Sequence, residues 1–167
     1  LEVFVLARER WGTPDTKMFP TTGTIYLSPF CDEELLKERN ASASFWRQTC
    51  YGVDLSCLEE VATEQLFAQP VVGYFDPSIL VCNNHVSHTF DFSTCSRKDL
   101  QAVEIPLKFE INKTTIVHGI ACWFDVKFCG SEAVVCLSTG PHTAGTHWYQ
   151  CRLLLREPIA VNATQTG

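Results

Sequence analysis

One short segment carries the residue types best suited to chemistry. Residues 145–150 read GTHWYQ, a turn that leads into an apolar run, and the imidazole of His147 stands beside the indole of Trp148. Binding and catalytic side chains are commonly placed where a loop meets a strand. The same pattern also fits a hydrogen-bonded histidine next to a core tryptophan, so spacing alone makes this segment a candidate site and assigns it no role.

Other chemistry-bearing residues form weaker patterns. His85 and His88 lie in or beside a polar turn, where an exposed loop is a simpler interpretation than a two-ligand metal site. Adjacent carboxylates such as Glu33-Glu34 are expected on a helix, where neighbours point about 100° apart and form a solvated face. The sequence has no glycine-rich phosphate loop, no G-x-S-x-G and no H-E-x-x-H. It predicts no metal site and no cofactor-binding residue in this chain.

The cysteines and glycosylation tripeptides point to different compartments. Nine cysteines are an odd number, so they cannot all pair within the chain, and none lies in a C-x-x-C motif. Reduced, buried thiols are the simpler interpretation. Acceptor tripeptides begin at Asn40, Asn112 and Asn162 and leave open a secreted β-sandwich glycoprotein held by disulfides. Intact-mass measurement with and without reductant would separate the two, and we expect free thiols and no glycan.

Composition indicates one folded domain. The 167 residues are 46% hydrophobic and 19% charged, which excludes a disordered or coiled-coil chain. The net charge of −6 and the lack of a Lys/Arg block argue against direct nucleic-acid binding. No apolar stretch approaches the ~20 residues of a membrane-spanning helix, so no membrane contact is expected.

The first third of the chain predicts two helical regions around one strand. Leu1 to Trp11 is interpreted as the end of a helix because Gly12 and two basic residues suit a helix C-terminus. Residues 13–23 have the composition of a connector. A short strand follows at 24–27, and Pro29 is expected to end it or confine it to a sheet edge.

Residues 32–70 are expected to form an inserted pair of helices. Asp32 is a suitable N-cap for the first helix. The second is expected to begin at Ser56, because Ser56 and Glu59 match a capping box, and to end before Pro70. Its apolar face comprises Leu58, Val61, Ala62 and Leu66.

The remainder predicts a mainly β fold. Runs rich in β-branched and aromatic residues alternate with turn residues, at intervals that suit a meander or Greek-key sandwich or barrel. Within 123–128, Phe124, Val126 and Phe128 are expected on one face and Trp123, Asp125 and Lys127 on the other. The expected strands cover 79–82, 88–92, 103–111, 116–128, 134–138 and 148–155.

A set of short segments, in order along the whole chain, carries a family resemblance. They are FPT at 19–21, FW at 45–46, YGVDL at 51–55, QPVV at 69–72, IPLKF at 105–109, HGIACWFDV at 118–126, LST at 137–139 and THW at 146–148. Together they resemble the carboxyl-terminal β-barrel region of the type I protein arginine methyltransferases, most closely their coactivator-associated, histone-modifying branch.

The resemblance implies a fold and an activity. Residues 19–167 would form an incomplete β-barrel or sandwich with a helical dimerisation arm at 32–70. Residues 1–18 would be the helix tail and linker of a missing Rossmann-like domain. The parent protein would be an S-adenosylmethionine-dependent protein arginine N-methyltransferase, nuclear and cytoplasmic. It would form a homodimer through the arm and modify proteins such as histone tails and RNA-binding proteins.

The resemblance also implies roles for three residues. His147 would orient and electrostatically support the active site, Trp148 would form one of its walls, and Thr146 would hold the turn. The S-adenosylmethionine site and the two glutamates that hold the substrate guanidinium would lie before Leu1. Because a guanidinium has a pKa above ~12, methyl transfer needs such carboxylates. We therefore expect the isolated chain to be inactive. The alternative is a dimerising or substrate-presenting module without catalysis.

Overall fold

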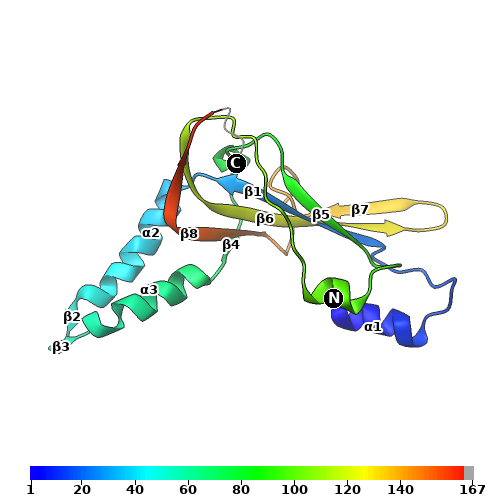
Figure 1. Ribbon diagram of the computed structural model, residues 1–167, viewed down its shortest axis with the longest axis horizontal. Coiled ribbons are helices and arrows are strands. Elements are labelled where there is room, and N and C mark those ends of the chain that lie inside the picture. The colour runs from blue at the N-terminus through cyan, green and yellow to red at the C-terminus, as the bar shows by residue number, and fades with distance from the viewer. Residues whose placement is uncertain (164–167) are drawn as a thin grey trace.

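The computed structural model describes residues 1–163 and consists of one open antiparallel sheet with helices at both ends (Figure 1). The sheet order is β4-β8-β6-β1-β5, and β7 also pairs with β6. This confirms the expected mainly β fold. The third glycosylation tripeptide ends outside the described residues. The strands are β1 (Thr22–Phe30), β4 (Val71–Gly73), β5 (Val86–Asp91), β6 (Thr115–Cys129), β7 (Val134–Ser138) and β8 (Gln150–Val161).

Strand β6 is the spine of the sheet. It pairs with β1 along one side and with β8 and then β7 along the other. The predicted alternation is borne out by two packing contacts: the buried Trp123 ring stacks on Tyr26 at 5.8 Å on one face, and Phe124 meets Trp148 edge-on at 6.3 Å on the other. The pairing with β8 shifts register between Val117 and Gly119.

Two apolar clusters hold the sheet to its surroundings. The first joins β1, β6 and β8 to the start of the helix at residues 33–44, and the second joins residues 109–111 to β6 and to residues 81–82. The first comprises Phe30, Leu35, Leu80, Ala121, Trp123 and Leu154. The second comprises Val81, Cys82, Phe109, Ile111 and Val117.

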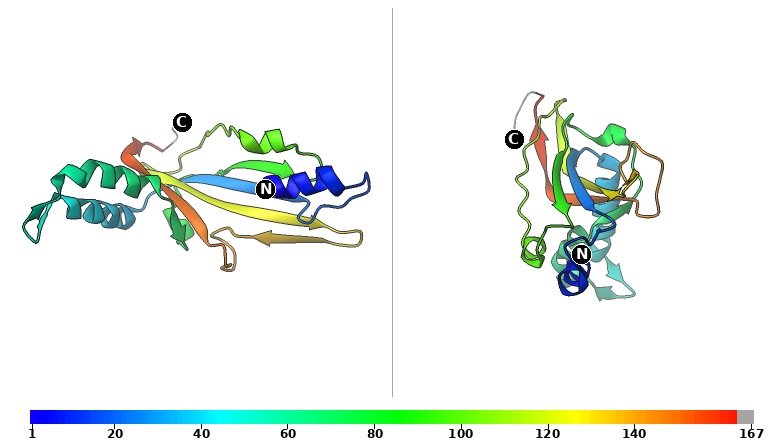
Figure 2. Two further views of the ribbon diagram at one scale, coloured as in Figure 1. Left: turned by 90° about the horizontal axis from the view of Figure 1, so that it is seen from below. Right: turned by 90° about the vertical axis from the view of Figure 1, so that its right-hand side faces the viewer.

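A helical hairpin, called the arm below, projects from one end of the sheet (Figure 2). It consists of α2 (Glu33–Ser44) and α3 (Glu59–Ala68), with a small hairpin of β2 (Thr49–Cys50) and β3 (Val53–Asp54) between them. Two 3₁₀ turns, η1 (Phe45–Arg47) and η2 (Ser56–Leu58), flank that hairpin. Asp32 caps α2 as predicted, since its Oδ1 accepts from the backbone N–H of Leu35 at 3.0 Å.

The predicted capping box at Ser56 is wrong. Residues 56–58 form the turn η2, and α3 begins at Glu59 without a side-chain cap. The N–H of Ser56 donates to Asp54 Oδ1 at 2.9 Å, and Glu59 forms an ion pair with Arg47. Both residues of the proposed box therefore have other partners: Asp54 accepts the N–H of Ser56, and Arg47 pairs with the carboxylate of Glu59.

Pro29 neither ends β1 nor places it at an edge. Strand β1 continues to Phe30 and lies between β5 and β6. Pairing with β5 stops at Leu27, so the missing N–H of Pro29 leaves no ladder bond unmade there. The Pro29 carbonyl instead accepts from the N–H of Val81 at 3.1 Å.

Two predicted strands are irregular. Residues 103–109 have no regular secondary structure, and Ile111 forms an isolated bridge with Cys82. The 3₁₀ turn η3 (Pro77–Ile79) replaces the start of the strand expected at 79–82, and only Leu80 and Cys82 form isolated bridges. Burial in the two clusters explains Leu80, Val81, Cys82, Phe109 and Ile111 without strand pairing, whereas Val103 and Leu107 are 39% and 45% exposed.

Helices at the opposite end of the sheet pack on each other. Helix α1 (Glu2–Trp11) confirms the helix predicted over residues 1–11, and Val5 is fully buried. Arg8 donates to the carbonyls of Phe92 and Cys95, both at 2.6 Å. The short α4 (Arg97–Gln101) was not expected, although the pair Ser96 and Asp99 that caps it is a recognisable signal. No helix within residues 1–163 is long and apolar enough to cross a bilayer.

Candidate functional site

The segment that carries His147 and Trp148 is a tight turn at the entrance to β8. The N–H of Tyr149 donates to the Thr146 carbonyl at 3.2 Å, and Tyr149 has a φ of 55°, in the left-handed region. The next residue, Gln150, is buried and its amide Nε2 donates to the Thr139 carbonyl at 2.8 Å. The turn is therefore fixed at its carboxyl end by the sheet.

A tyrosine that follows strand β4 holds the same turn. Tyr74 follows β4, and its hydroxyl donates to the Thr146 carbonyl at 2.7 Å. Its ring lies 4.7 Å from that of Tyr149. A Cβ on Gly145 would come within 2.8 Å of the Tyr74 hydroxyl oxygen, so glycine allows this approach. Sequence reasoning missed Tyr74, because nothing in residues 69–74 signals a contact with a turn 72 positions away.

His147 and Trp148 both face solvent. The Trp148 side chain is 55% exposed and rests edge-on against Phe124, and the His147 ring lies 6.1 Å from the Trp148 ring. The Thr146 hydroxyl is buried with no hydrogen-bond partner among the described residues. The geometry brings all three predicted site residues to one surface turn, where the imidazole and indole are available to another chain or domain.

A shallow apolar groove of about 360 Å³ lies beside Trp148. Cys122 and Cys151 are cross-strand partners on its floor. Burial, with a smaller contribution from Cys151, raises the pKa of Cys122 to about 11. These thiols are protonated near neutral pH, so the groove contains no activated nucleophile. Its lining residues are Ile25, Val72, Cys122, Trp123, Phe124, Trp148, Tyr149, Gln150 and Cys151.

The remaining candidates have structural surroundings. His85 packs edge-on against Trp123 at 4.9 Å, where burial and the nearby His142 lower its pKa. His88 instead packs on Phe90 at 4.6 Å. Across residues 1–163, no cluster of three or more His, Cys, Asp or Glu side chains could hold a metal ion. All nine cysteines are free thiols in the structure, which gives no support to the disulfide-held alternative.

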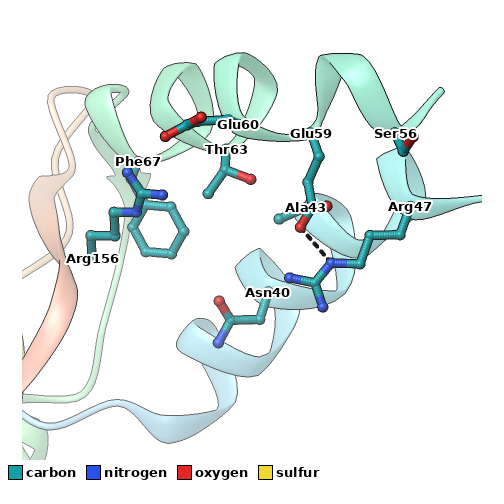
Figure 3. A pocket seen from close by; sticks show the side chains of 9 residues that line it. All are labelled: Asn40, Ala43, Arg47, Ser56, Glu59, Glu60, Thr63, Phe67 and Arg156. Atoms are coloured by element: carbon teal, nitrogen blue, oxygen red, sulfur yellow. Dashed lines mark hydrogen bonds and ion pairs between the residues drawn. The ribbon is translucent and has the colours of Figure 1, made fainter.

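A cleft lies within the arm (Figure 3). It has a volume of about 590 Å³ between α2 and α3, and an ion pair between Arg47 and Glu59 spans one end. The adjacent Glu59 and Glu60 point in different directions, as expected for helical neighbours. Its lining is mostly polar: Asn40, Ala43, Arg47, Ser56, Glu59, Glu60, Thr63, Phe67 and Arg156.

The described residues do not fit an S-adenosylmethionine site. Nucleotide cofactors in doubly wound folds bind at the carboxyl ends of parallel strands, next to a glycine-rich turn. Every strand pair within residues 1–163 is antiparallel. The described residues therefore lack the parallel strands that border such a site.

The fold is an open antiparallel sheet with a projecting helical arm. Residues 21–166 match a family model described as the arginine methyltransferase oligomerization subdomain. The chain belongs to the protein arginine methyltransferase family.

Relatives of this chain include proteins named as histone-arginine methyltransferases. It is 47% identical over 166 residues to the probable histone-arginine methyltransferase CARM1 of Oryza sativa subsp. indica, covering 99% of this chain and 31% of that protein. It is 44% identical over 167 residues to the histone-arginine methyltransferase CARMER of Drosophila persimilis, with the same coverage. The chain thus spans about a third of the length of these relatives.

Solved structures support the fold. The Trypanosoma brucei PRMT1 enzyme-prozyme heterotetrameric complex with AdoHcy superposes with a TM-score of 0.79 at 29% identity, covering 99% of this chain and 50% of that one. Protein arginine methyltransferase 10 of Arabidopsis thaliana superposes with a TM-score of 0.77 at 22% identity, covering 97% and 52%.

Proposed function

We propose that this chain is the oligomerization and substrate-side part of an S-adenosylmethionine-dependent protein arginine N-methyltransferase that acts on histones. The family match over residues 21–166, with 47% identity to a histone-arginine methyltransferase, carries this proposal. The methyl donor, which supplies an electrophilic methyl group when bound, would be held by a domain outside this chain. RNA-binding proteins are further substrates, and nuclear and cytoplasmic location follows from these substrate classes.

The chain's own residues would support the reaction rather than perform it. Trp148 would form a wall beside the substrate-binding loop of the cofactor domain. His147 would orient an acidic group of that domain by hydrogen bonding and would support the active site electrostatically. Its exposure at the turn allows such a contact. Thr146 would hold the turn through its carbonyl, which accepts from both Tyr74 and Tyr149.

A chimera tests the proposed activity. The matched 166-residue segment of the rice relative would be replaced by this chain, and transfer of labelled methyl groups to a histone peptide would be measured. We expect turnover within about tenfold of the rice enzyme, because a homologous subdomain occupies the same place in the chimera. A tenfold change in rate corresponds to about 1.4 kcal/mol in the activation barrier. A chimera that forms dimers and binds donor yet transfers no methyl group would favour the non-catalytic alternative.

We expect His147→Ala in that chimera to lower kcat about 10- to 100-fold, the range for one supporting polar group in an active site. Because the side chain is exposed, the melting temperature should change by less than about 2 °C. His142→Ala, an exposed histidine of the preceding loop, is the matched control. Unchanged kcat with a lower melting temperature would assign His147 a structural role only.

The arm is proposed as the dimer contact. Helix α3 has no buried residue, its apolar Val61 is 54% exposed, and Leu58 of the preceding turn η2 is 45% exposed. The hairpin tip adds the fully exposed Tyr51 and the 60% exposed Val53. Large apolar side chains gathered on a projecting element are typical of a protein interface.

We expect Val61→Glu in the chimera to weaken dimerisation at least about tenfold, since it would place a charge in a desolvated contact. Val134→Glu on β7 is the matched control, because Val134 is 60% exposed and lies outside the arm. Sedimentation equilibrium would measure both. A Val61→Glu protein that dimerises as tightly as the control would exclude this face of α3.

A further inference from the structure

We propose that Tyr74 is a positioning residue that links the arm to the turn carrying His147 and Trp148. The inference rests on the proposed function, in which the arm contacts a second subunit and the turn borders the active site. It goes beyond that function because it assigns one residue, Tyr74, to the connection between the arm and the turn.

The segment that follows the arm, residues 69–74, leads directly to the turn. Helix α3 ends at Ala68, and β4 then pairs with the first three residues of β8, with Gly73 opposite Gln150. Tyr74 is the next residue, and its hydroxyl bonds the Thr146 carbonyl at 2.7 Å. Only five residues therefore separate the end of the arm from the side chain that holds the turn.

The segment that enters the arm is also attached to β8. Arg152 of β8 donates from Nη1 to Asp32 Oδ2 at 2.7 Å, and Asp32 caps the first arm helix. The Arg152 guanidinium also lies 5.7 Å from the ring of Phe75, the neighbour of Tyr74. Both ends of the arm are thus attached within the first residues of β8, so a shift of the arm must be passed to the start of this strand or absorbed at these contacts.

The turn has few other supports that could absorb such a shift. Its side chains at 147–149 are exposed, and its one internal backbone bond ends on the carbonyl that Tyr74 also contacts. Tyr149 adopts its left-handed conformation beneath the Tyr74 ring. Such a conformation persists where surrounding contacts enforce it. Removing the Tyr74 hydroxyl should therefore loosen the turn without unfolding the sheet.

Tyr74→Phe tests the link by two independent measurements. In the chimera we expect kcat to fall about three- to tenfold, the effect of one hydrogen bond, while KM for the methyl donor stays within about twofold. In the 167-residue chain we expect the Tyr149 amide to exchange with deuterium about three- to tenfold faster. Thr89→Val, which removes an exposed hydroxyl bond of 2.8 Å to Thr24, is the matched control and should change neither.

The outcomes separate this inference from the proposed function. Wild-type kcat and wild-type exchange in Tyr74→Phe would overturn the link. A fall in melting temperature with kcat and exchange unchanged would also overturn it, since Tyr74 would then only stabilise the fold. If the unmodified chimera transfers no methyl group, the proposed function fails, and the exchange measurement still decides whether Tyr74 holds the turn.

Discussion

Replacing Gly119 with alanine is expected to lower the free energy of unfolding by at least about 3 kcal/mol, because the new methyl group meets rigid backbone. A Cβ at this position would lie 2.1 Å from the Leu153 carbonyl oxygen and 2.8 Å from the Phe30 ring. Gly119 sits where the β6–β8 register shifts, and Phe30 is fully buried. Neither neighbour can move without separating the two strands or opening the core.

Gly73→Ala is the matched control for this prediction. Gly73 also lies in a strand that pairs with β8, but a Cβ there has no atom within 4 Å. We expect its unfolding free energy to change by no more than about 0.5 kcal/mol. Urea titrations followed by far-ultraviolet circular dichroism would measure both. Equal midpoints for the two variants would show that the β6–β8 contact is looser than the structure indicates.

Arg152→Met is expected to cost about 3 kcal/mol of stability, the lower end of the range for breaking a buried ion pair. The Arg152 and Asp32 side chains are only 12% and 18% exposed and their charged atoms are 2.7 Å apart. Methionine would fill much of the space but leave the Asp32 carboxylate with its capping bond alone. The loss should appear as a lower urea midpoint and as a looser root of the arm.

Arg156→Met provides the comparison on the same strand. Its ion pair with Glu64 spans 3.9 Å, and the two side chains are 55% and 62% exposed. Pairs of this kind contribute about 0–1 kcal/mol, so we expect a shift within about 0.5 kcal/mol. If Arg152→Met and Arg156→Met unfolded at the same urea concentration, the Asp32 contact would not anchor the arm.

Local signals in the sequence predicted the elements whose causes are local. Asp32 as a cap and the alternation around Trp123 and Phe124 depend on neighbours a few residues away, and both are confirmed. The capping box at Ser56 failed because Asp54 competes for the same N–H. Residues 103–111 have strand composition, yet no strand ladder within residues 1–163 includes them, and burial in a cluster accounts for Phe109 and Ile111 only.

The candidate site was predictable only in part for the same reason. Thr146, His147 and Trp148 are contiguous, so their shared turn could be expected from the sequence. The contacts that fix the turn come from Tyr74, Thr139 and Phe124, whose approach depends on the sheet topology. Their roles could not be read from spacing, because strand order and register determine which distant residues meet.

The proposed function divides the work between two parts: this chain supplies the arm and the supporting turn, and another domain supplies the methyl donor. Isothermal titration of the 167-residue chain with S-adenosylmethionine tests this division. We expect no binding heat at donor concentrations up to about 1 mM, which corresponds to less than about 4 kcal/mol of binding free energy. Saturable one-to-one binding in the micromolar range, lost on mutation of residues in this chain, would contradict it.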